Sequence, residues 1–266
     1  MPALALQGYG YVRGRVLDAL AEVGRISLFV LETLRSLGRG LRAWPLVVDQ
    51  MHVIGVQSLQ LVVIVSLFTG AVAAVQAAYQ FSNVVPLRYI GTVILRSVII
   101  ELGPVLTALI VGGRVGASIA AELGTMRVTE QIDALEAMAI HPVRYLVVPR
   151  VVAAVVMLPV LTVMSDTIAV GGGYLVAVTS LGVSPHGYVV GLKQFFFVKD
   201  LASGLIKSTF FGAIIAWMGC YHGFRTEGGA EGVGVATTRA VVASCVQVLI
   251  TDYVLANVLF RFVFAK

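Results

Sequence analysis

The sequence predicts an all-α integral membrane protein with five transmembrane helices, an N-terminal interfacial helix and a cytoplasmic helix between two of the spans. Hydrophobic residues occupy 58% of the 266 positions and charged residues only 12%. A soluble domain has about 45–50% apolar and about 25% charged residues. The mean hydropathy of +0.93 points the same way. Because the apolar stretches lie beyond about residue 50, we expect a basic segment at 1–50 and a membrane domain at 51–266.

The N-terminal segment is basic and amphipathic. Leucine and valine recur in it at helical spacing, and Arg35, Arg39 and Arg42 mark the opposite face of its second half. A helix of this kind lies in the headgroup layer with its apolar face toward the lipid tails. A solvated basic helix is the alternative. The six arginines of the segment are Arg13, Arg15, Arg25, Arg35, Arg39 and Arg42.

Five segments are long and apolar enough to span a membrane, which takes about 20 mainly apolar residues. We place them at about 53–78, 90–113, 151–178, 200–222 and 238–262. A charged stretch at 114–150 separates the second span from the third and is predicted to be extramembrane and mostly helical. A loop with a short surface helix is expected at 179–199, and a glycine-rich loop around Gly228 to Gly234 before the last span.

The distribution of basic residues predicts the orientation. If the N-terminus is cytoplasmic, the segments 1–50, 114–150 and 223–239 lie on the cytoplasmic side and hold 12 of the 19 lysines and arginines. The positive-inside rule favours this arrangement. We therefore expect a cytoplasmic N-terminus and a cytoplasmic central segment, with residues 179–199 on the opposite side.

Each of the last four spans carries one ionisable residue that could serve function: Glu101, Asp166, Lys207 and Asp252, in that order. A charge at the bilayer centre costs about 2.5–3.5 kcal/mol on insertion scales, so such residues normally face a polar cavity or a partner charge. We expect Glu101, Lys207 and Asp252 to line a substrate cavity, together with the polar residues at the end of the first span, Gln76 and Tyr79. A structural ion pair is the alternative for Glu101 and Lys207.

The central segment is predicted to serve as a docking helix for a soluble partner. It places acidic residues beside apolar ones on a short helix held between two spans, an arrangement that fits a groove on another protein. A solvated loop helix is the alternative. The candidate coupling residues are Glu122, Glu130, Gln131, Asp133 and Leu135. Preceding them, a stripe of small residues that would let helices approach closely consists of Gly112, Gly116, Ala120 and Gly124.

Motifs for intrinsic catalysis are missing from the sequence. It contains no phosphate-binding G-x-x-x-x-G-K-[ST] loop, no G-x-S-x-G elbow and no H-E-x-x-H pair. The two cysteines, Cys220 and Cys245, give no metal-ligand spacing. We expect no cofactor, no metal, no nucleic acid and no enzymatic activity in this chain.

Seven short motifs stand out along the chain: Glu101-Leu-Gly-Pro104, Gly113-Arg114-Val-Gly116, Ala121-Glu122-Leu-Gly124-Thr-Met126, Glu130-Gln131-Ile-Asp133-Ala134-Leu135, Pro149-Arg150, Leu205-Ile206-Lys207-Ser208 and Ala236-Thr237-Thr238-Arg239-Ala240-Val241-Val242. Together they resemble those of the MlaE (YrbE) permeases, the membrane subunits of ABC transporters that work with MCE lipid-binding proteins. The similarity covers the chain from about residue 45. Immediately before Glu101, where members of the family often have a basic residue, this chain has Ile100.

This resemblance implies a homodimeric permease in the bacterial inner membrane that moves phospholipid between the inner and outer membranes. It implies a cytoplasmic ATPase that supplies the ATP and Mg chemistry and docks on the coupling segment near Glu130 to Leu135. It also implies a periplasmic MCE hexamer and, in some systems, a STAS-domain subunit. By position, Glu101 and Lys207 match charged family residues near the lipid cavity.

Three alternatives remain at this stage. The first is an MCE-type permease that carries sterols or fatty acids. The second is an ion- or proton-coupled carrier that uses Glu101, Asp166 and Asp252, for which we find no convincing internal repeat. The third is a membrane enzyme of lipid synthesis, which would need clustered carboxylates for metal-assisted phosphoryl chemistry.

Overall fold

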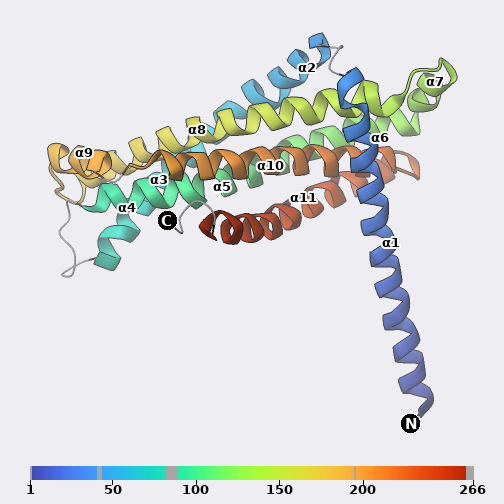
Figure 1. The fold of residues 1–266 in the computed structure, drawn as a ribbon, viewed down its shortest axis with the longest axis horizontal. Coiled ribbons are helices and arrows are strands. Elements are labelled where there is room, and N and C mark those ends of the chain that lie inside the picture. Colours follow the sequence, from blue (N-terminus) through green and yellow to red (C-terminus); the bar gives the residue numbers. More distant parts are fainter. Residues whose placement is uncertain (1, 41–43, 82–88, 195, 262–266) are drawn as a thin grey trace.

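A computed structural model describes residues 2–40, 44–81, 89–194 and 196–261, and every regular element in those ranges is helical. Figure 1 shows long helices that run side by side, with one helix, α1, leaving the bundle at one end. Five helical segments are long and apolar enough to cross a membrane. The prediction of an all-α membrane protein with five spans is confirmed. The spans are Trp44–Gln80, Ile90–Val128, Val143–Thr179, Val198–Phe224 and Gly229–Leu259.

The spans are built from α-helices, several of which are joined end to end by single π-helical turns. The α-helices are α1 (Pro2–Gly40), α2 (Trp44–Met51), α3 (Gln57–Phe81), α4 (Ile90–Ser97), α5 (Gly103–Val111), α6 (Ala117–Val128), α7 (Gln131–Ala137), α8 (Val148–Thr179), α9 (Pro185–Gln194), α10 (Val198–Phe224) and α11 (Gly229–Leu259). The π turns are η1 (His52–Val56), η3 (Val98–Leu102), η4 (Gly112–Gly116) and η5 (Val143–Val147). Such turns insert an extra residue, shift the faces of the helix and occur often at functional sites.

The spans are longer than the apolar stretches that predicted them. The first begins at Trp44 rather than 53, the second continues to Val128 rather than 113, and the third begins at Val143 rather than 151. Hydropathy detects the part of a helix that matches lipid, whereas the helix itself continues while its charged residues find partners. Arg114 and Glu122 both find such partners, as described below.

The predicted glycine-rich loop before the last span is wrong in extent. Gly229, Gly232 and Gly234 lie in the first turns of α11, and only a short turn separates α10 from it. Gly228, just before α11, has a φ of 84°, a conformation that suits glycine. Glycine lowers helix propensity by about 1 kcal/mol, but packing and the start of a long apolar helix outweigh that cost here.

The core of the bundle forms where α8 packs against α3 on one side and α10 on the other. Small residues allow backbones to meet. A Cβ on Gly70 of α3 would lie 1.7 Å from the carbonyl oxygen of Ala169, and a Cβ on Gly212 of α10 would lie 2.5 Å from that of Ala154. In a membrane, where lipid is as apolar as the helices, such close contact is a main source of association.

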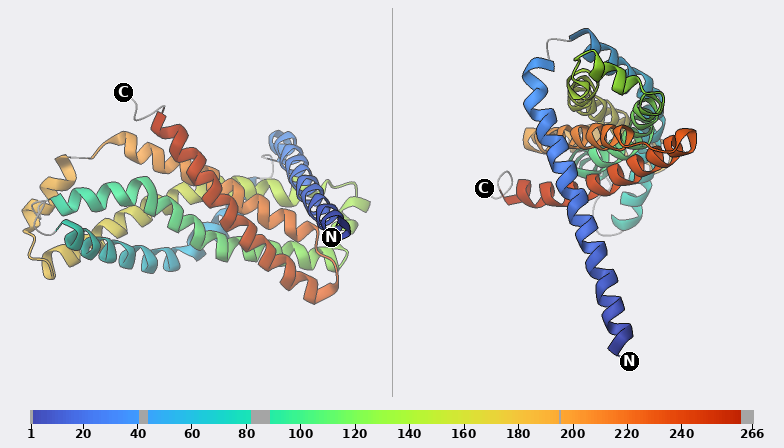
Figure 2. Two further views of the ribbon diagram at one scale, coloured as in Figure 1. Left: turned by 90° about the horizontal axis from the view of Figure 1, so that it is seen from below. Right: turned by 90° about the vertical axis from the view of Figure 1, so that its right-hand side faces the viewer.

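The two ends of the bundle differ in structure. One end carries α9 and α4, and the other carries α6, α7 and the turn between α10 and α11 (Figure 1). Helix α1 crosses the bundle at this second end and extends beyond it toward the N-terminus, as Figure 1 and the right-hand view of Figure 2 show. Phe29 of α1 packs against the rings of Tyr221 and Phe224, with centroids 5.8 and 6.0 Å apart.

Part of the predicted basic face of α1 lies outside the described residues. This holds for the side chains of Arg13, Arg15 and Arg39 and for Arg42 altogether. Among the arginines that are described, Arg25 pairs with Glu22 on the same helix. The interfacial location of α1, and the division of the chain at residue 50, remain predictions.

Candidate functional site

Three of the four ionisable residues predicted within the spans lie together at one site. The ammonium of Lys207 on α10 donates a hydrogen bond to Oε2 of Glu101 at 2.6 Å. Its Nζ also lies 2.9 Å from Oδ1 of Asp252 on α11. Glu101 belongs to the π turn η3, so the second, fourth and fifth spans meet at this lysine. We call these three residues the mid-span cluster.

The cluster is buried at its base and open at its acids. The Lys207 side chain is 1% exposed, whereas that of Glu101 is 44% exposed and that of Asp252 is 20% exposed. A buried ammonium without a partner would be strongly destabilising, and the two carboxylates compensate it. One lysine against two acids leaves a net negative charge, which the geometry places on the accessible side.

The fourth residue, Asp166, lies beside the cluster without joining it. Its side chain on α8 is buried against the backbone of Gly103, where an added Cβ would lie 1.7 Å from Oδ1 of Asp166. Within the described ranges Oδ1 of Asp166 has no hydrogen-bond partner. Because Gly103 directly follows the turn that carries Glu101, this close approach helps to determine where that turn sits.

An apolar groove begins next to the mid-span cluster. It has a volume of about 540 Å³ and runs along α3, with Leu102 closing one side. Gln76, one of the residues predicted to line a substrate cavity, is among the lining residues of this groove. Tyr79 lies one turn further on α3, is 80% exposed and does not line this groove. The lining residues are Ile64, Val65, Phe68, Thr69, Val72, Ala73, Gln76 and Leu102.

The coupling residues predicted on the central segment lie at the end of the bundle that carries α7. Two of them are paired within the chain: Glu122 with the buried Arg150 at 2.7 Å, and Asp133 with Arg127 at 2.5 Å. Glu130 is exposed and has a φ of 61°, which turns the chain sharply between α6 and α7.

The other two predicted coupling residues differ in exposure. Gln131 is exposed and donates to Oγ1 of Thr129 at 3.0 Å. Leu135 is partly buried and packs on the core, so it holds α7 in place and presents only part of its surface to a partner. The accessible part of the predicted docking surface is therefore polar.

The stripe of small residues faces α10 and α11. Added Cβ atoms at Gly112 and Gly116 would contact Ile215 and Ser244 at 3.5–3.9 Å, and one at Gly124 would lie 2.7 Å from Oγ1 of Thr226. The remaining residue of the stripe, Ala120, is fully buried. The four positions therefore lie where two other spans approach the second span.

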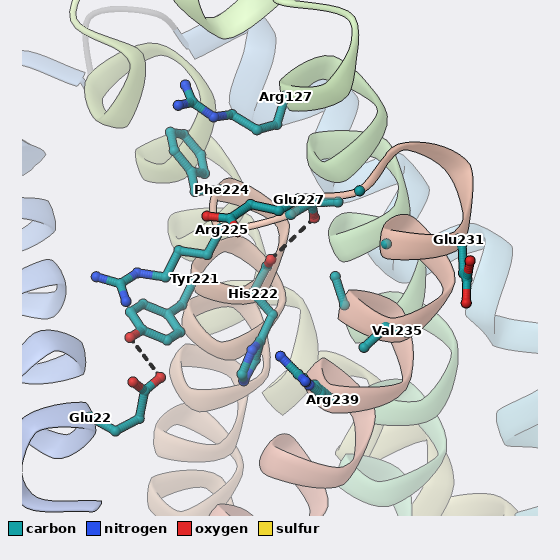
Figure 3. Close-up of a pocket in the computed structure, with 14 residues that line it drawn as sticks. Glu22, Arg127, Tyr221, His222, Phe224, Arg225, Glu227, Glu231, Val235 and Arg239 are labelled. Carbon is teal, nitrogen blue, oxygen red and sulfur yellow. Dashed lines mark hydrogen bonds between the residues drawn. The ribbon is translucent and has the colours of Figure 1, made fainter. Parts of the chain in front are cut away.

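A second, larger cavity was not predicted from the sequence. It has a volume of about 870 Å³ and lies between α1, the end of α6 and the turn that joins α10 to α11 (Figure 3). Three arginines and three glutamates line it, so it is polar and nearly balanced in charge. Sequence patterns do not reveal this cavity, because its charged residues come from four separate segments. They are Glu22, Arg127, Arg225, Glu227, Glu231 and Arg239.

Contacts within this cavity attach α1 to the bundle. The hydroxyl of Tyr221 donates to Oε1 of Glu22 at 2.8 Å, and Figure 3 shows the two side chains facing each other. The guanidinium of Arg225 lies 4.8 Å from the centre of the Tyr221 ring. Burial raises the pKa of Glu22, but hydrogen bonds from Tyr221 and Arg25 and the charges of Arg25 and Arg225 outweigh it. The net result is a pKa below the ordinary 4.5.

No group of three His, Cys, Asp or Glu side chains that could hold a metal ion occurs in the described part of the chain. The arrangement as a whole combines a charged cluster within the spans, an apolar groove beside it and a polar surface at one end of the bundle.

Comparison with known proteins gives consistent results. A family model described as "Permease MlaE" matches residues 47–258. A probable ABC transporter permease protein of Rickettsia bellii is 42% identical over 93% of this chain and 95% of its own length. The intermembrane phospholipid transport system permease protein MlaE of Haemophilus influenzae is 34% identical over 92% of this chain and 95% of its own.

A plant protein is also similar. The chloroplastic protein TRIGALACTOSYLDIACYLGLYCEROL 1 of Arabidopsis thaliana is 38% identical over 82% of this chain and 62% of its own length. The similarity therefore extends across bacteria and to a chloroplast protein.

Proposed function

This chain belongs to the MlaE permease family of ABC transporter permeases, and we propose that it moves phospholipids between the inner and outer membranes of a bacterium. The name of the Haemophilus relative, which includes intermembrane phospholipid transport, supports this cargo. In this proposal the chain has no ATPase activity of its own, in keeping with the absence of a phosphate-binding loop from its sequence. ATP and Mg are bound by a separate cytoplasmic ATPase.

The observation that carries the proposal is the mid-span cluster beside the apolar groove. A phospholipid has a charged headgroup and apolar tails, so its path needs polar groups within the membrane and an apolar surface next to them. Glu101 and Asp252 supply accessible carboxylates, Lys207 holds them, and Leu102 connects the cluster with the groove along α3. The charged residues in a membrane span that line a substrate pathway typically combine in this way.

The proposed ATPase contact is the polar end of the bundle around α7. Glu130 and Gln131 are exposed there, while the pairs Glu122–Arg150 and Arg127–Asp133 hold the segment to the spans on either side. A movement of α7 would therefore be transmitted to α6 and α8. In the proposed orientation this end and the N-terminus are cytoplasmic.

The remaining partners belong to the same proposal. We propose a homodimer in the inner membrane, a periplasmic MCE hexamer at the end that carries α9, and a STAS-domain subunit where the system has one. The exposed apolar face of α11 supports a membrane-embedded surface on that helix, for lipid or for a second protomer. Its residues are Val242, Val246, Leu249, Ile250, Tyr253 and Val254.

Reconstitution tests the cargo. The permease with its ATPase in donor vesicles should transfer labelled phosphatidylethanolamine to an acceptor in an ATP-dependent way. Lys207→Ala should lower transfer per molecule at least about tenfold, since it leaves two carboxylates without their counter-charge. The matched control is Lys199→Ala, an exposed lysine at the start of the same helix. If a sterol or fatty acid moves and phospholipid does not, the proposed cargo is wrong.

A further inference from the structure

Arg114 is a charged residue of the second span that lies outside the proposed lipid path. It lies on the π turn η4 and reaches across to the first span. Its Nη1 donates to the carbonyl oxygen of Val53 at 3.2 Å and to Oγ of Ser58 at 2.8 Å, and its Nη2 donates to Oε1 of Gln57 at 2.8 Å. Every one of these acceptors is neutral.

The positive charge of Arg114 has no counter-charge in the described ranges, where no carboxylate oxygen lies within 4 Å of its guanidinium. Three other basic residues of the spans do have one: Arg150 has Glu122, Lys207 has Glu101 and Arg96 has Asp200. Arg144 and Arg239, like Arg114, have none within 4 Å in the described ranges. A guanidinium is permanently charged. Within a membrane such a charge needs an anion nearby.

The surroundings of Arg114 leave room for that anion. The residue is only half-buried, and Gln57, His52 and Val56 on the first span are exposed. An added Cβ on the neighbouring Gly113 would meet no atom within 4 Å. The anion therefore has space beside the guanidinium, on the surface where the first and second spans meet.

Donors remain for a phosphate. Three hydrogen bonds use only part of the five N–H groups of a guanidinium, and Gln57 accepts through Oε1, which leaves its amide N–H groups to donate. Arginine binds phosphate with two parallel hydrogen bonds. The hydroxyl of Ser58 donates to the carbonyl oxygen of Ile54 at 2.7 Å, so it orients the guanidinium rather than the ligand.

This location is separate from the mid-span cluster. Arg114 follows Glu101 by 13 residues on one continuous helix, a rise of about 20 Å. It precedes Glu122, at the end of the bundle that carries α7, by 8 residues, or about 12 Å. With the mid-span cluster taken as the bilayer centre, about 20 Å exceeds the half-thickness of about 15 Å of the hydrocarbon core, which puts Arg114 at the headgroup region on the α7 side.

We propose that Arg114 and Gln57 form a binding site for the phosphate group of an anionic membrane lipid in the leaflet at the α7 end. The lipid supplies the missing counter-charge and links η1 to η4, the two π turns that Arg114 joins. A free phosphate ion has the same chemistry, but a lipid is present at this depth and is held there by its tails.

Gln57→Glu tests the site most sharply. It places a carboxylate next to a guanidinium that is already in contact with residue 57, so the counter-charge comes from the chain itself. In the complete complex, purified from mixed micelles with equal phosphatidylglycerol and phosphatidylcholine, retained phosphatidylglycerol should fall about tenfold, as expected when one charge-assisted contact is lost. The matched control, Gln50→Glu, makes the same change two turns earlier and should retain phosphatidylglycerol like the unmodified complex.

Arg114→Gln and Arg114→Lys provide a second test. The glutamine variant can still hydrogen-bond but has no charge, so it should lose phosphatidylglycerol, whereas the lysine variant should keep most of it. Inorganic phosphate added to the complex in lipid-free amphipol should not raise its melting temperature, whereas phosphatidylglycerol should.

Four results would overturn the proposal. In the first, Gln57→Glu retains as much phosphatidylglycerol as the Gln50→Glu control. In the second, Arg114→Gln dissociates the homodimer while lipid retention is unchanged, which would show that a second copy of this chain supplies the counter-charge. In the third, phosphate alone stabilises the complex as well as the lipid does. In the fourth, phosphatidylcholine is lost in parallel with phosphatidylglycerol. Lipid retention is measured without transport, so failure of the proposed cargo would leave this test unaffected.

Discussion

The mid-span cluster and the end of the bundle at α7 both pair acids with bases, but they do so in opposite surroundings. In the cluster a lysine that is 1% exposed holds two acids from different spans. At the α7 end, Arg127 and Asp133 are 40% and 52% exposed and lie six residues apart on one segment. If Arg127 or Asp133 loses its partner, water can replace it, whereas no water reaches the buried ammonium of Lys207 if its acids are lost.

This difference separates residues that hold the spans together from residues that can change partners. An exposed ion pair contributes about 0–1 kcal/mol, whereas removal of one member of a buried pair can cost about 3–5 kcal/mol. The exposed Arg127–Asp133 pair at the α7 end can therefore be exchanged for contacts with an ATPase at little cost. The cluster cannot change its pairs without a ligand of complementary charge.

One test addresses the packing beside the mid-span cluster, at Gly103. Gly103→Ala would bring a methyl group within 1.7 Å of Oδ1 of Asp166, so the Asp166 carboxylate must move from its buried position. We expect about 1–3 kcal/mol of destabilisation, the usual cost of overpacking. The measurement is the thermal unfolding of the purified permease. Gly171→Ala on α8, where an added Cβ meets no atom within 4 Å, is the control and should be neutral or stabilising. Equal unfolding of the two variants would remove the proposed constraint on the turn.

The next effect compares charge removal at the two sites. Lys207→Met keeps the apolar stem and removes the ammonium, and it should lower transport per molecule at least about tenfold through loss of a buried pair. Arg127→Met, which breaks the exposed pair with Asp133, should change stability by about 0.5 kcal/mol or less. A vesicle transfer assay and thermal unfolding on both variants make the comparison. If Lys207→Met transports normally, the cluster is structural.

Reversal of charge at the α7 end should separate coupling from folding. Glu130→Lys combined with Asp133→Lys should leave the melting temperature nearly unchanged, because both side chains are exposed. The same variant should lose its ATPase on affinity purification and its lipid-stimulated ATP hydrolysis. The control is Glu136→Lys with Glu130 and Asp133 unchanged. Glu136 is also exposed, so this variant adds positive charge to α7 without altering the predicted coupling residues. Normal assembly of the double variant would place the docking surface elsewhere.

The smallest effect concerns pH and the attachment of α1. The pKa of Glu22 is lowered in the folded protein, so its contribution is fully present above the ordinary value of 4.5 and is lost as the pH falls through the lower folded-state value. The side chain is 40% exposed, so Glu22→Gln should cost only about 0.5 kcal/mol at pH 7. The difference in melting temperature between the variant and the unmodified protein should shrink below pH 4.5. A difference that is constant with pH would rule out this ionic contribution.

The spans could be predicted from the sequence because a run of apolar residues has few other uses, and all five were found. Their ends could not, because a helix continues beyond the lipid wherever a charge finds a partner, as Glu122 does in Arg150. The π turns were also missed. A π turn adds one residue to a helix without altering its composition. Hydropathy therefore cannot reveal η3, the turn that contains Glu101.

The candidate site was predicted in its members and not in its geometry. Glu101, Lys207 and Asp252 attract notice because charges are rare in apolar segments, but their meeting at one lysine depends on how three spans rotate. The cavity beside α1 escaped notice for a related reason. Glu22, Arg127 and Arg239 look like ordinary surface charges until the fold brings α1 across the bundle.

The backbone contact between α3 and α8 has a mechanical consequence. Gly70 and Gly172 let each helix touch the backbone of the other, with added Cβ atoms only 1.7 Å from the carbonyl oxygen of Ala169 and 2.3 Å from that of Leu67. Two helices in backbone contact at two points cannot slide or rotate against each other without breaking both contacts, so α3 and α8 form a rigid unit. Helix α11 buries few of its side chains and has no such lock. During transport, α3 and α8 should keep their relative arrangement while α11 moves relative to them. Strain should then concentrate at Lys207 on α10, which contacts both η3 and α11.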